Sequence, residues 1–83
     1  MFSVDFSKFA LKQFYKLNRN LQERIIKTLE RIKIRPHHFV KRKAGTSYYI
    51  LRVGDYRVIL DIQNQKLIIL VLELGPRNSI YSK

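Results

Sequence analysis

The chain has 83 residues, and its 17 lysines and arginines against 6 aspartates and glutamates give a formal charge of +11 at pH 7. This length suits one small domain, which we expect to span residues 1–83. The absence of cysteine excludes disulfides, thiolate metal sites and cysteine nucleophiles. No apolar run approaches the ~20 residues that span a bilayer, and the first residues lack the pattern of a secretory signal. The sequence therefore predicts a cytoplasmic protein that does not enter a membrane.

Hydrophobic residues make up 46% of the chain, which is too many for a disordered basic tail, so we expect the chain to fold. The excess positive charge repels itself and therefore favours an anionic partner: nucleic acid, an acidic protein or a membrane surface. Nucleic acid is our first expectation.

Alternation from Phe2 to Phe6 predicts a short first strand. Ser7 is a candidate cap for a helix that runs to about Asn18. The buried stripe of this helix is predicted to be Ala10, Phe14 and Leu17.

The other side of this first helix has a stripe of positive charge. The stripe consists of Lys8, Lys12, Lys16 and Arg19, at positions i, i+4, i+8 and i+11, a like-charge spacing that destabilises an isolated helix slightly. The stripe is either a solvated surface or an anion-binding one.

A second helix is predicted from Asn20, which with Glu23 forms a capping box, to a stop at Pro36. Its apolar stripe is Leu21, Ile25, Leu29 and Ile32. Because the link between the two helices is short, they are predicted to form an antiparallel hairpin.

Three segments rich in strand-forming residues follow a basic loop that contains Lys41, Arg42 and Lys43. They are predicted at 47–53, 56–62 and 66–74. Gly54-Asp55 suits a two-residue type II′ turn, and Asn64-Gln65 is predicted as a second two-residue loop. The sequence therefore predicts a two-layer α+β fold in which a short N-terminal strand and the helical hairpin combine with a C-terminal antiparallel β-meander, the helices packing on the sheet.

A two-residue turn at Gly54-Asp55 places Arg52 opposite Arg57. Like charges directly across a strand pair are destabilising, so we expect an anion between them. The opposite side of this hairpin is the expected bed for the helices and contains Tyr49, Leu51, Val53, Tyr56, Val58 and Leu60.

Arg52 and Arg57 share one face of the predicted sheet, the arginine face. Extending the register through Asn64-Gln65 also gives this face Ile50, Ile59, Ile68, Leu70 and Leu72, and gives the helix-covered face Leu67, Ile69 and Val71. Such an apolar surface is expected to be covered in part, by a partner or by the chain's own tail. Asp61 and Glu73 are predicted on different faces.

The segment after Gly75-Pro76 is predicted to fold towards the arginine face. Arg77 would then add a guanidinium suited to bidentate phosphate binding, and Tyr81 would offer a ring for base stacking and a titratable hydroxyl. Four side chains are thus predicted to converge on one anion: Arg52, Arg57, Arg77 and Tyr81.

Two stretches of the sequence resemble a known family. They are Tyr49-Ile50-Leu51-Arg52-Val53-Gly54-Asp55-Tyr56-Arg57-Val58, and Leu74-Gly75-Pro76-Arg77 with Tyr81 four residues later. Over nearly its whole length the chain resembles the RelE/ParE superfamily of type II toxin-antitoxin toxins, and RelE more closely. The resemblance implies a RelE-like fold, a toxin that enters the ribosomal A site and cleaves messenger RNA, and a RelB-like antitoxin with acidic amphipathic segments.

The same resemblance implies a metal-free ribonuclease without a cofactor, in which a 2′-hydroxyl attacks the adjacent phosphate. By matching position, Arg57 and Arg77 would hold the phosphate, Tyr81 would stack on a base or help proton transfer, and Arg52 matches a second basic residue of the family's strand. Further RNA contacts are expected from the basic loop and the helix stripe: Lys41, Arg42, Lys43, Lys8, Lys12 and Lys16.

Ile50 stands where many relatives have a basic residue, so one candidate general base is missing. Lys41, Arg42 or Lys43 is a possible substitute from the loop. His37 or His38 is another candidate acid or base, but the pair lacks further His or Cys partners and no metal site is expected.

Two alternatives to the ribosome-dependent ribonuclease remain open. A ParE-like toxin would inhibit DNA gyrase by protein binding alone, which the missing base at Ile50 favours and the pairing of Arg77 with Tyr81 opposes. The other alternative is a basic RNA-binding relative without catalytic activity.

Overall fold

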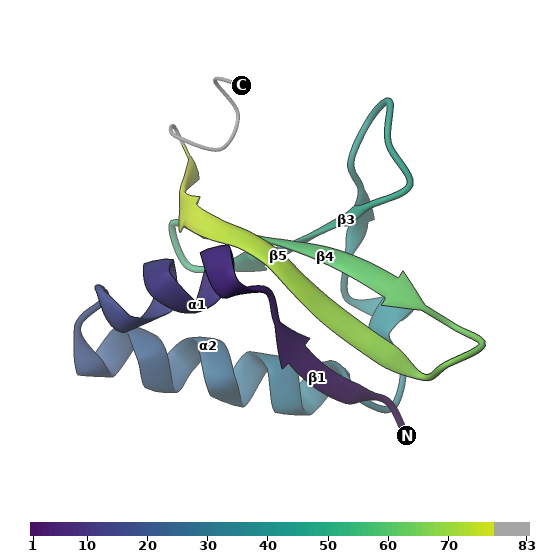
Figure 1. Ribbon diagram of the computed structural model, residues 1–83, viewed down its shortest axis with the longest axis horizontal. Helices are drawn as coiled ribbons and strands as arrows, with labels where there is room; N and C mark the ends of the chain where they lie inside the picture. Colours follow the sequence, from purple (N-terminus) through teal and green to yellow (C-terminus); the bar gives the residue numbers. More distant parts are fainter. Residues whose placement is uncertain (78–83) are drawn as a thin grey trace.

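The computed structural model describes residues 1–77, in which two helices pack on one face of a five-stranded sheet (Figure 1). The strand order across the sheet is β1-β5-β4-β3-β2. These strands span Ser3–Phe6 (β1), Lys41–Arg42 (β2), Tyr49–Val53 (β3), Tyr56–Gln63 (β4) and Ile68–Pro76 (β5). The predicted two-layer α+β arrangement is confirmed. The sheet is nevertheless mixed, because β1 pairs with β5 in parallel while the other pairs are antiparallel.

The first helix, α1 (Lys8–Tyr15), begins at the predicted cap: the Ser7 hydroxyl accepts a hydrogen bond of 3.0 Å from the Ala10 N–H. It ends before the predicted limit at Asn18. The reason is that Asn18 has an extended backbone and caps the next helix, where its Oδ1 accepts a 2.9 Å hydrogen bond from the Leu21 N–H.

The second helix, α2, therefore spans Arg19–Ile32, and the predicted capping box of Asn20 and Glu23 is wrong. Asn20 lies inside the first turn of the helix. Pro36 does not terminate α2 directly, but begins a short 3-10 turn, η1 (Pro36–His38). Neither helix is long and apolar enough to cross a membrane.

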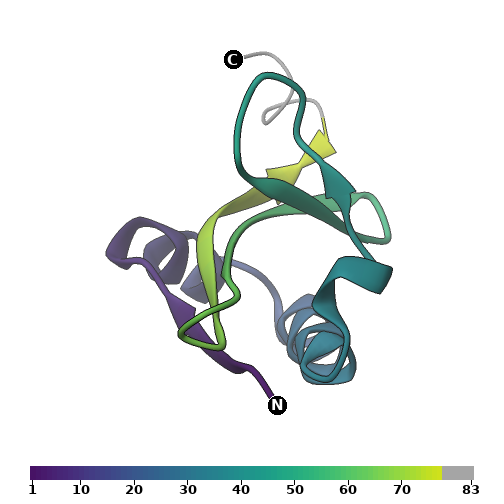
Figure 2. The ribbon, with the colours of Figure 1, turned by 90° about the vertical axis from the view of Figure 1, so that its right-hand side faces the viewer.

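The core lies between the helical layer and the sheet. Both predicted apolar stripes face it, with Leu17 and Leu21 at its margin. Its buried residues come from α1 (Ala10, Phe14), α2 (Ile25, Leu29, Ile32), β3 (Leu51, Val53), β4 (Val58, Leu60, Ile62) and β5 (Ile69, Val71, Leu74). The helices consequently cover one face of the sheet and leave the arginine face uncovered, as Figure 2 shows from the side.

The β3-β4 hairpin has the predicted register. Arg52 pairs with Arg57 and the pairing continues from Val53↔Tyr56 to Tyr49↔Leu60. Gly54 has φ of +58°, and Asp55 has no positive φ. A positive φ at the first central residue alone is the signature of a type II′ turn.

The β4-β5 connection is longer than the predicted two-residue loop, because β4 ends at Gln63 and β5 begins at Ile68. A two-residue type I′ turn needs positive φ at both central residues, and neither Asn64 nor Gln65 adopts it. Instead Leu67 has φ of +55° and is 46% exposed, so its predicted place in the core-facing strand is wrong. The two additional loop residues preserve the alternation, and Ile69 and Val71 face the core as predicted.

A β-bulge in β5 changes the register near the strand's end. Leu60 pairs with Val71 but Ile59 pairs with Glu73, which leaves Leu72 as the extra residue. Glu73 therefore lies on the arginine face together with Asp61, and the prediction that these two carboxylates occupy different faces is wrong. The alternation argument assumed an unbroken strand, and a bulge reverses every face beyond it.

Candidate functional site

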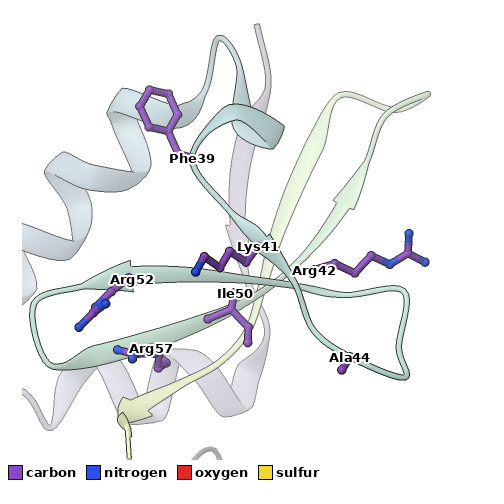
Figure 3. A pocket seen from close by; sticks show the side chains of 7 residues that line it. All are labelled: Phe39, Lys41, Arg42, Ala44, Ile50, Arg52 and Arg57. Atoms are coloured by element: carbon purple, nitrogen blue, oxygen red, sulfur yellow. The ribbon is translucent and has the colours of Figure 1, made fainter.

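The centre of the arginine face is the cross-strand pair of Arg52 and Arg57. Arg57 is only 5% exposed and its Nη1 atom is shielded from solvent, whereas Arg52 is exposed. Figure 3 shows both side chains on the same side of the hairpin. Directly opposed residues have Cβ atoms about 4.5–5.5 Å apart, so the two guanidinium groups form one concentrated positive site.

A strand that the sequence did not predict adds a third cation to this site. β2 forms in the segment predicted as a basic loop, and it pairs with β3 so that Lys41 is opposite Ile50 and Arg42 is opposite Tyr49. Lys41 thus shares the arginine face. Arg42 points the other way (Figure 3), and its Nε donates a 3.2 Å hydrogen bond to the Thr46 carbonyl.

These side chains surround a cavity of about 370 Å³. Its lining residues are Phe39, Lys41, Arg42, Ala44, Ile50, Arg52 and Arg57, none of which is acidic (Figure 3). The volume is within the range of ~300–1,000 Å³ that small-molecule sites occupy. Cationic groups above an apolar floor make a site that can bind a phosphate together with part of an attached nucleotide.

Acidic residues lie on the other part of the same face. Glu73 is opposite Ile59, and both Asp5 and Asp61 pair with Leu70 on its two sides. The arginine face is therefore divided into a basic part at the β3-β4 turn and an acidic, apolar part near β1. An anion bound to this face is directed to the basic part.

Arg77 lies immediately after β5, at the same end of the sheet as the arginine pair. Its N–H donates a 3.1 Å hydrogen bond to the Asp55 carbonyl in the β3-β4 turn, and its side chain is exposed. It is not among the residues that line the cavity. Tyr81, the fourth predicted member of the site, lies outside the described residues.

The remaining predicted RNA-binding residues are not brought to this cavity. Lys8, Lys12 and Lys16 are exposed residues of the helical layer, which covers the other face of the sheet. Lys43 does not line the cavity, and its N–H donates a 2.9 Å hydrogen bond to the Tyr48 carbonyl.

Neither of the two histidines lines the cavity. His37 Nε2 is 2.7 Å from Asn64 Oδ1, and its ring packs edge-on against Tyr49 at 5.1 Å between centroids. His38 packs against Phe39 at 5.2 Å. Within residues 1–77, no group of three or more His, Cys, Asp or Glu side chains is placed to hold a metal ion.

Sequence reasoning did not assign Phe39 and Ala44 to the site, although both form its wall. Phe39 precedes β2, and Ala44 lies in the loop between β2 and β3, which extends on the side away from the helices (Figure 2). Neither residue belongs to a sequence pattern that would indicate a place in the site. Only the pairing of β2 with β3 brings them to the arginine pair.

A comparison with protein families now adds an independent observation. Residues 4–81 match the model described as ParE toxin of type II toxin-antitoxin system, parDE. The chain belongs to the RelE/ParE superfamily of type II toxins. A search of curated proteins gives no match.

Solved structures of RelE toxins resemble this superfamily member in fold. The archaeal RelE-RelB complex from Pyrococcus horikoshii OT3 is 28% identical with a TM-score of 0.78, and the match covers 92% of this chain and 94% of that one. The intact E. coli RelBE toxin-antitoxin complex is 25% identical with a TM-score of 0.77, over 92% and 96% of the two chains.

The isolated E. coli RelE toxin has a TM-score of 0.80 at 24% identity, with 99% of this chain and 93% of that chain covered. At that identity the likeness shows the fold alone. The predicted RelE-like fold of this toxin is therefore confirmed.

Proposed function

We propose that this toxin is an endoribonuclease that cleaves messenger RNA in the ribosomal A site without a metal ion and so inhibits translation. The observation that supports this proposal is the cavity in which Lys41, Arg52 and Arg57 meet. A phosphodiester held there has cationic groups close to its non-bridging oxygens. The solved relatives that are RelE toxins make RNA cleavage the first activity to test.

The reaction is an intramolecular transfer of the phosphoryl group. The 2′-oxygen forms a bond to phosphorus while the bond from phosphorus to the 5′-oxygen breaks, which gives a 2′,3′-cyclic phosphate and a 5′-hydroxyl. One proton leaves the 2′-hydroxyl and one reaches the departing 5′-oxygen. Negative charge grows on the phosphoryl oxygens in the transition state, and fixed cations stabilise it.

In this proposal Arg57 is the fixed cation, because it is buried on a central strand of the sheet. Arg52 is exposed and can adjust to the bound RNA. Arg77, in the chain segment after β5, also binds the phosphate, and Tyr81 stacks on a base or assists proton transfer. Arg42, which also lines the cavity, makes a further RNA contact. Lys43, the α1 lysines Lys8 and Lys12, and Lys16 at the C-cap of α1 contact RNA outside the cavity.

We further propose a RelB-like antitoxin as the partner that restrains the toxin. Two of the solved relatives are complexes of RelE with RelB. An acidic amphipathic segment fits a chain whose formal charge is +11, because opposite charges favour association.

A second candidate function is the inhibition of DNA gyrase by protein binding. Two observations favour it: the matching family model is that of ParE toxins, and the cavity is lined by the apolar Ile50. Under this alternative the cationic cavity binds acidic side chains of a protein rather than RNA.

Mapping messenger 5′ ends after a short pulse of toxin expression separates the two functions. The ribonuclease generates new 5′ ends with codon phasing inside translated regions, and these ends carry a 5′-hydroxyl. A gyrase inhibitor leaves messages intact and causes DNA breaks. Phased 5′ ends without DNA breaks support the ribonuclease, and the reverse pattern excludes it.

A further inference from the structure

The edge strand β2 gives this chain a cation where β3 has an apolar residue. Ile50 precedes Arg52 by two residues on β3, and Lys41 on the edge strand is its direct cross-strand neighbour. We propose that Lys41 contacts the scissile phosphate as the third cation of the cavity and stabilises the charge that develops there during cleavage. This inference rests on the proposed ribonuclease function and adds a catalytic residue from the edge strand.

The pairing of β2 with β3 selects Lys41 from the three basic residues of this segment. Lys41 is opposite Ile50 and therefore on the arginine face, whereas Arg42 is opposite Tyr49 and directed to the other side. Figure 3 shows the Lys41 side chain extending towards Arg52 and the Arg42 side chain extending away. Lys43 lies beyond β2 and does not line the cavity.

Reach and exposure both allow this contact. Cross-strand neighbours have Cβ atoms about 4.5–5.5 Å apart, and residues two apart on one strand are separated by about 7 Å. Lys41 and Arg52 are thus close enough for one phosphate to bridge the ends of their long side chains. Lys41 is exposed, so its ammonium can approach a ligand without first breaking a packed contact.

The three cations have complementary places around the cavity. Arg57 forms its buried side and Arg52 lies opposite on β3, while Lys41 approaches from the sheet edge. An ammonium is a compact charge with rotatable donors, in contrast to the planar fork of a guanidinium. Lys41 therefore suits an oxygen whose position changes as phosphorus becomes five-coordinate.

The exchange of a charge between neighbouring strands tests this assignment. Purified ribosomes programmed with a short message are treated with excess toxin, and the cleavage rate is measured in a single turnover. We expect Lys41→Ala to lower the rate by about 100-fold, the usual effect of losing one transition-state donor. The double variant Lys41→Ala with Ile50→Lys should cleave about tenfold faster than Lys41→Ala alone, because the new ammonium enters the same cavity from the neighbouring strand.

Lys66 provides the matched control, because it is an exposed lysine in the β4-β5 loop, outside the cavity. Lys66→Ala removes the same charge and leaves the rate unchanged. If Lys41→Ala and Lys66→Ala cleave equally well in an experiment where the wild-type toxin is active, the Lys41 assignment is wrong and the ribonuclease proposal stands. The same conclusion follows if Ile50→Lys gives no recovery.

A binding measurement separates failure of the assignment from failure of the proposed function. A short single-stranded RNA with 2′-deoxyribose at the cleavage position is titrated at several salt concentrations. Loss of one phosphate contact lowers the slope of log affinity against log salt by about 0.7, which we expect for Lys41→Ala and not for Lys66→Ala. If the wild-type toxin cleaves no RNA, the catalytic role of Lys41 is wrong together with the ribonuclease proposal. If the wild type and Lys41→Ala then also have equal salt slopes, Lys41 does not contact the phosphate either.

Discussion

At the scale of single residues, the opposed arginines are the most informative feature. Arg52 and Arg57 are direct neighbours on two strands, where like charges cost stability. Arg57 is also buried, at 5% exposure, although arginine is rarely buried in proteins. Residues that lower stability in this way are typical of sites that bind a ligand, because selection for function tolerates the loss.

The stability loss can be measured with a neutral variant of the exposed arginine. Arg52→Gln preserves most of the side-chain length and removes one of the two charges. We expect the free energy of unfolding to rise by about 0.2–1 kcal/mol while the cleavage rate falls. Urea denaturation at low salt checks the first effect, and the gain should shrink at 1 M salt because the Debye length falls to about 3 Å. A loss of stability would show that the pair is not repulsive.

Arg77 is the proposed phosphate contact that least affects the fold. Its side chain is exposed, and its one described backbone hydrogen bond to Asp55 does not need the guanidinium. Arg77→Ala should therefore abolish growth inhibition in cells while leaving the melting temperature and antitoxin binding unchanged. Arg31→Ala is the control, because Arg31 is an exposed arginine of α2. A fully toxic, folded Arg77→Ala protein would remove Arg77 from the site.

At the scale of elements, helix α1 holds the irregular part of β5. The Ser7 hydroxyl donates a 3.0 Å hydrogen bond to the Leu72 carbonyl, and Gln13 Oε1 accepts a 2.8 Å hydrogen bond from the Leu74 N–H. The first bond is made by Leu72, the extra residue of β5, and the second by Leu74, two residues further along the strand. The bulge brings Gly75 opposite Arg57 and places Arg77 at the β3-β4 turn, so α1 positions part of the site from the opposite layer.

Removing the Gln13 amide tests this support. Leu74 is buried, and in Gln13→Ala its N–H loses the hydrogen-bond partner. We expect the free energy of unfolding to fall by about 1–3 kcal/mol, the penalty for an unsatisfied buried donor. Urea denaturation measures this loss, and faster exchange of the Leu74 amide proton locates it. Gln65→Ala, in the exposed β4-β5 loop, should change stability by less than about 0.5 kcal/mol.

The two hairpins show which parts of the fold are local enough to predict. Gly54 has the positive φ of a type II′ turn, so the turn residues themselves set the register of Arg52 and Arg57. Asn64-Gln65 contains no glycine, and the observed loop uses Leu67 for its positive φ. The bulge depends on Ser7, the cap of α1, and on Gln13 within α1, which lie 65 and 61 residues from their partners in the sequence. Short-range patterns do not contain that information.

The candidate site likewise has one part that the sequence predicts and one part that it does not. The arginine pair follows from one tight turn and could be predicted. The place of Lys41 could not be predicted. Most strands have about 3–10 residues, but β2 has two, which is too short for an alternating pattern to appear in the sequence. Its pairing with β3 distinguishes Lys41 from Arg42, which sequence reasoning treated as equivalent members of a basic loop.

At the scale of the whole molecule, charge is distributed unevenly over the two layers. Three of the 6 acidic residues, Asp5, Asp61 and Glu73, lie on the arginine face, and the α1 lysines lie on the helical layer. RNA in the cavity and RNA along α1 would therefore contact different sides of the protein. Such an arrangement suits a molecule inserted between several RNA surfaces better than one that binds along a single strand.

The excess charge also makes the free toxin sensitive to an acidic partner. A folded chain with a formal charge of +11 is destabilised by self-repulsion, and a partner that binds the folded toxin more tightly than the unfolded chain stabilises it. At a partner concentration 100 times Kd, linkage adds about 2.7 kcal/mol to the free energy of unfolding. For a domain of this size that corresponds to a rise in melting temperature of roughly 10–20 °C.

Thermal denaturation with the purified product of the neighbouring gene measures this shift. The rise should shrink as salt is added, because part of the attraction is between exposed charges. Arg77→Ala toxin should show the same rise as the wild type, since the proposed contact of Arg77 is with RNA. A partner that leaves the melting temperature unchanged at saturating concentration would argue against a cognate antitoxin and hence against the toxin-antitoxin pairing proposed for this chain.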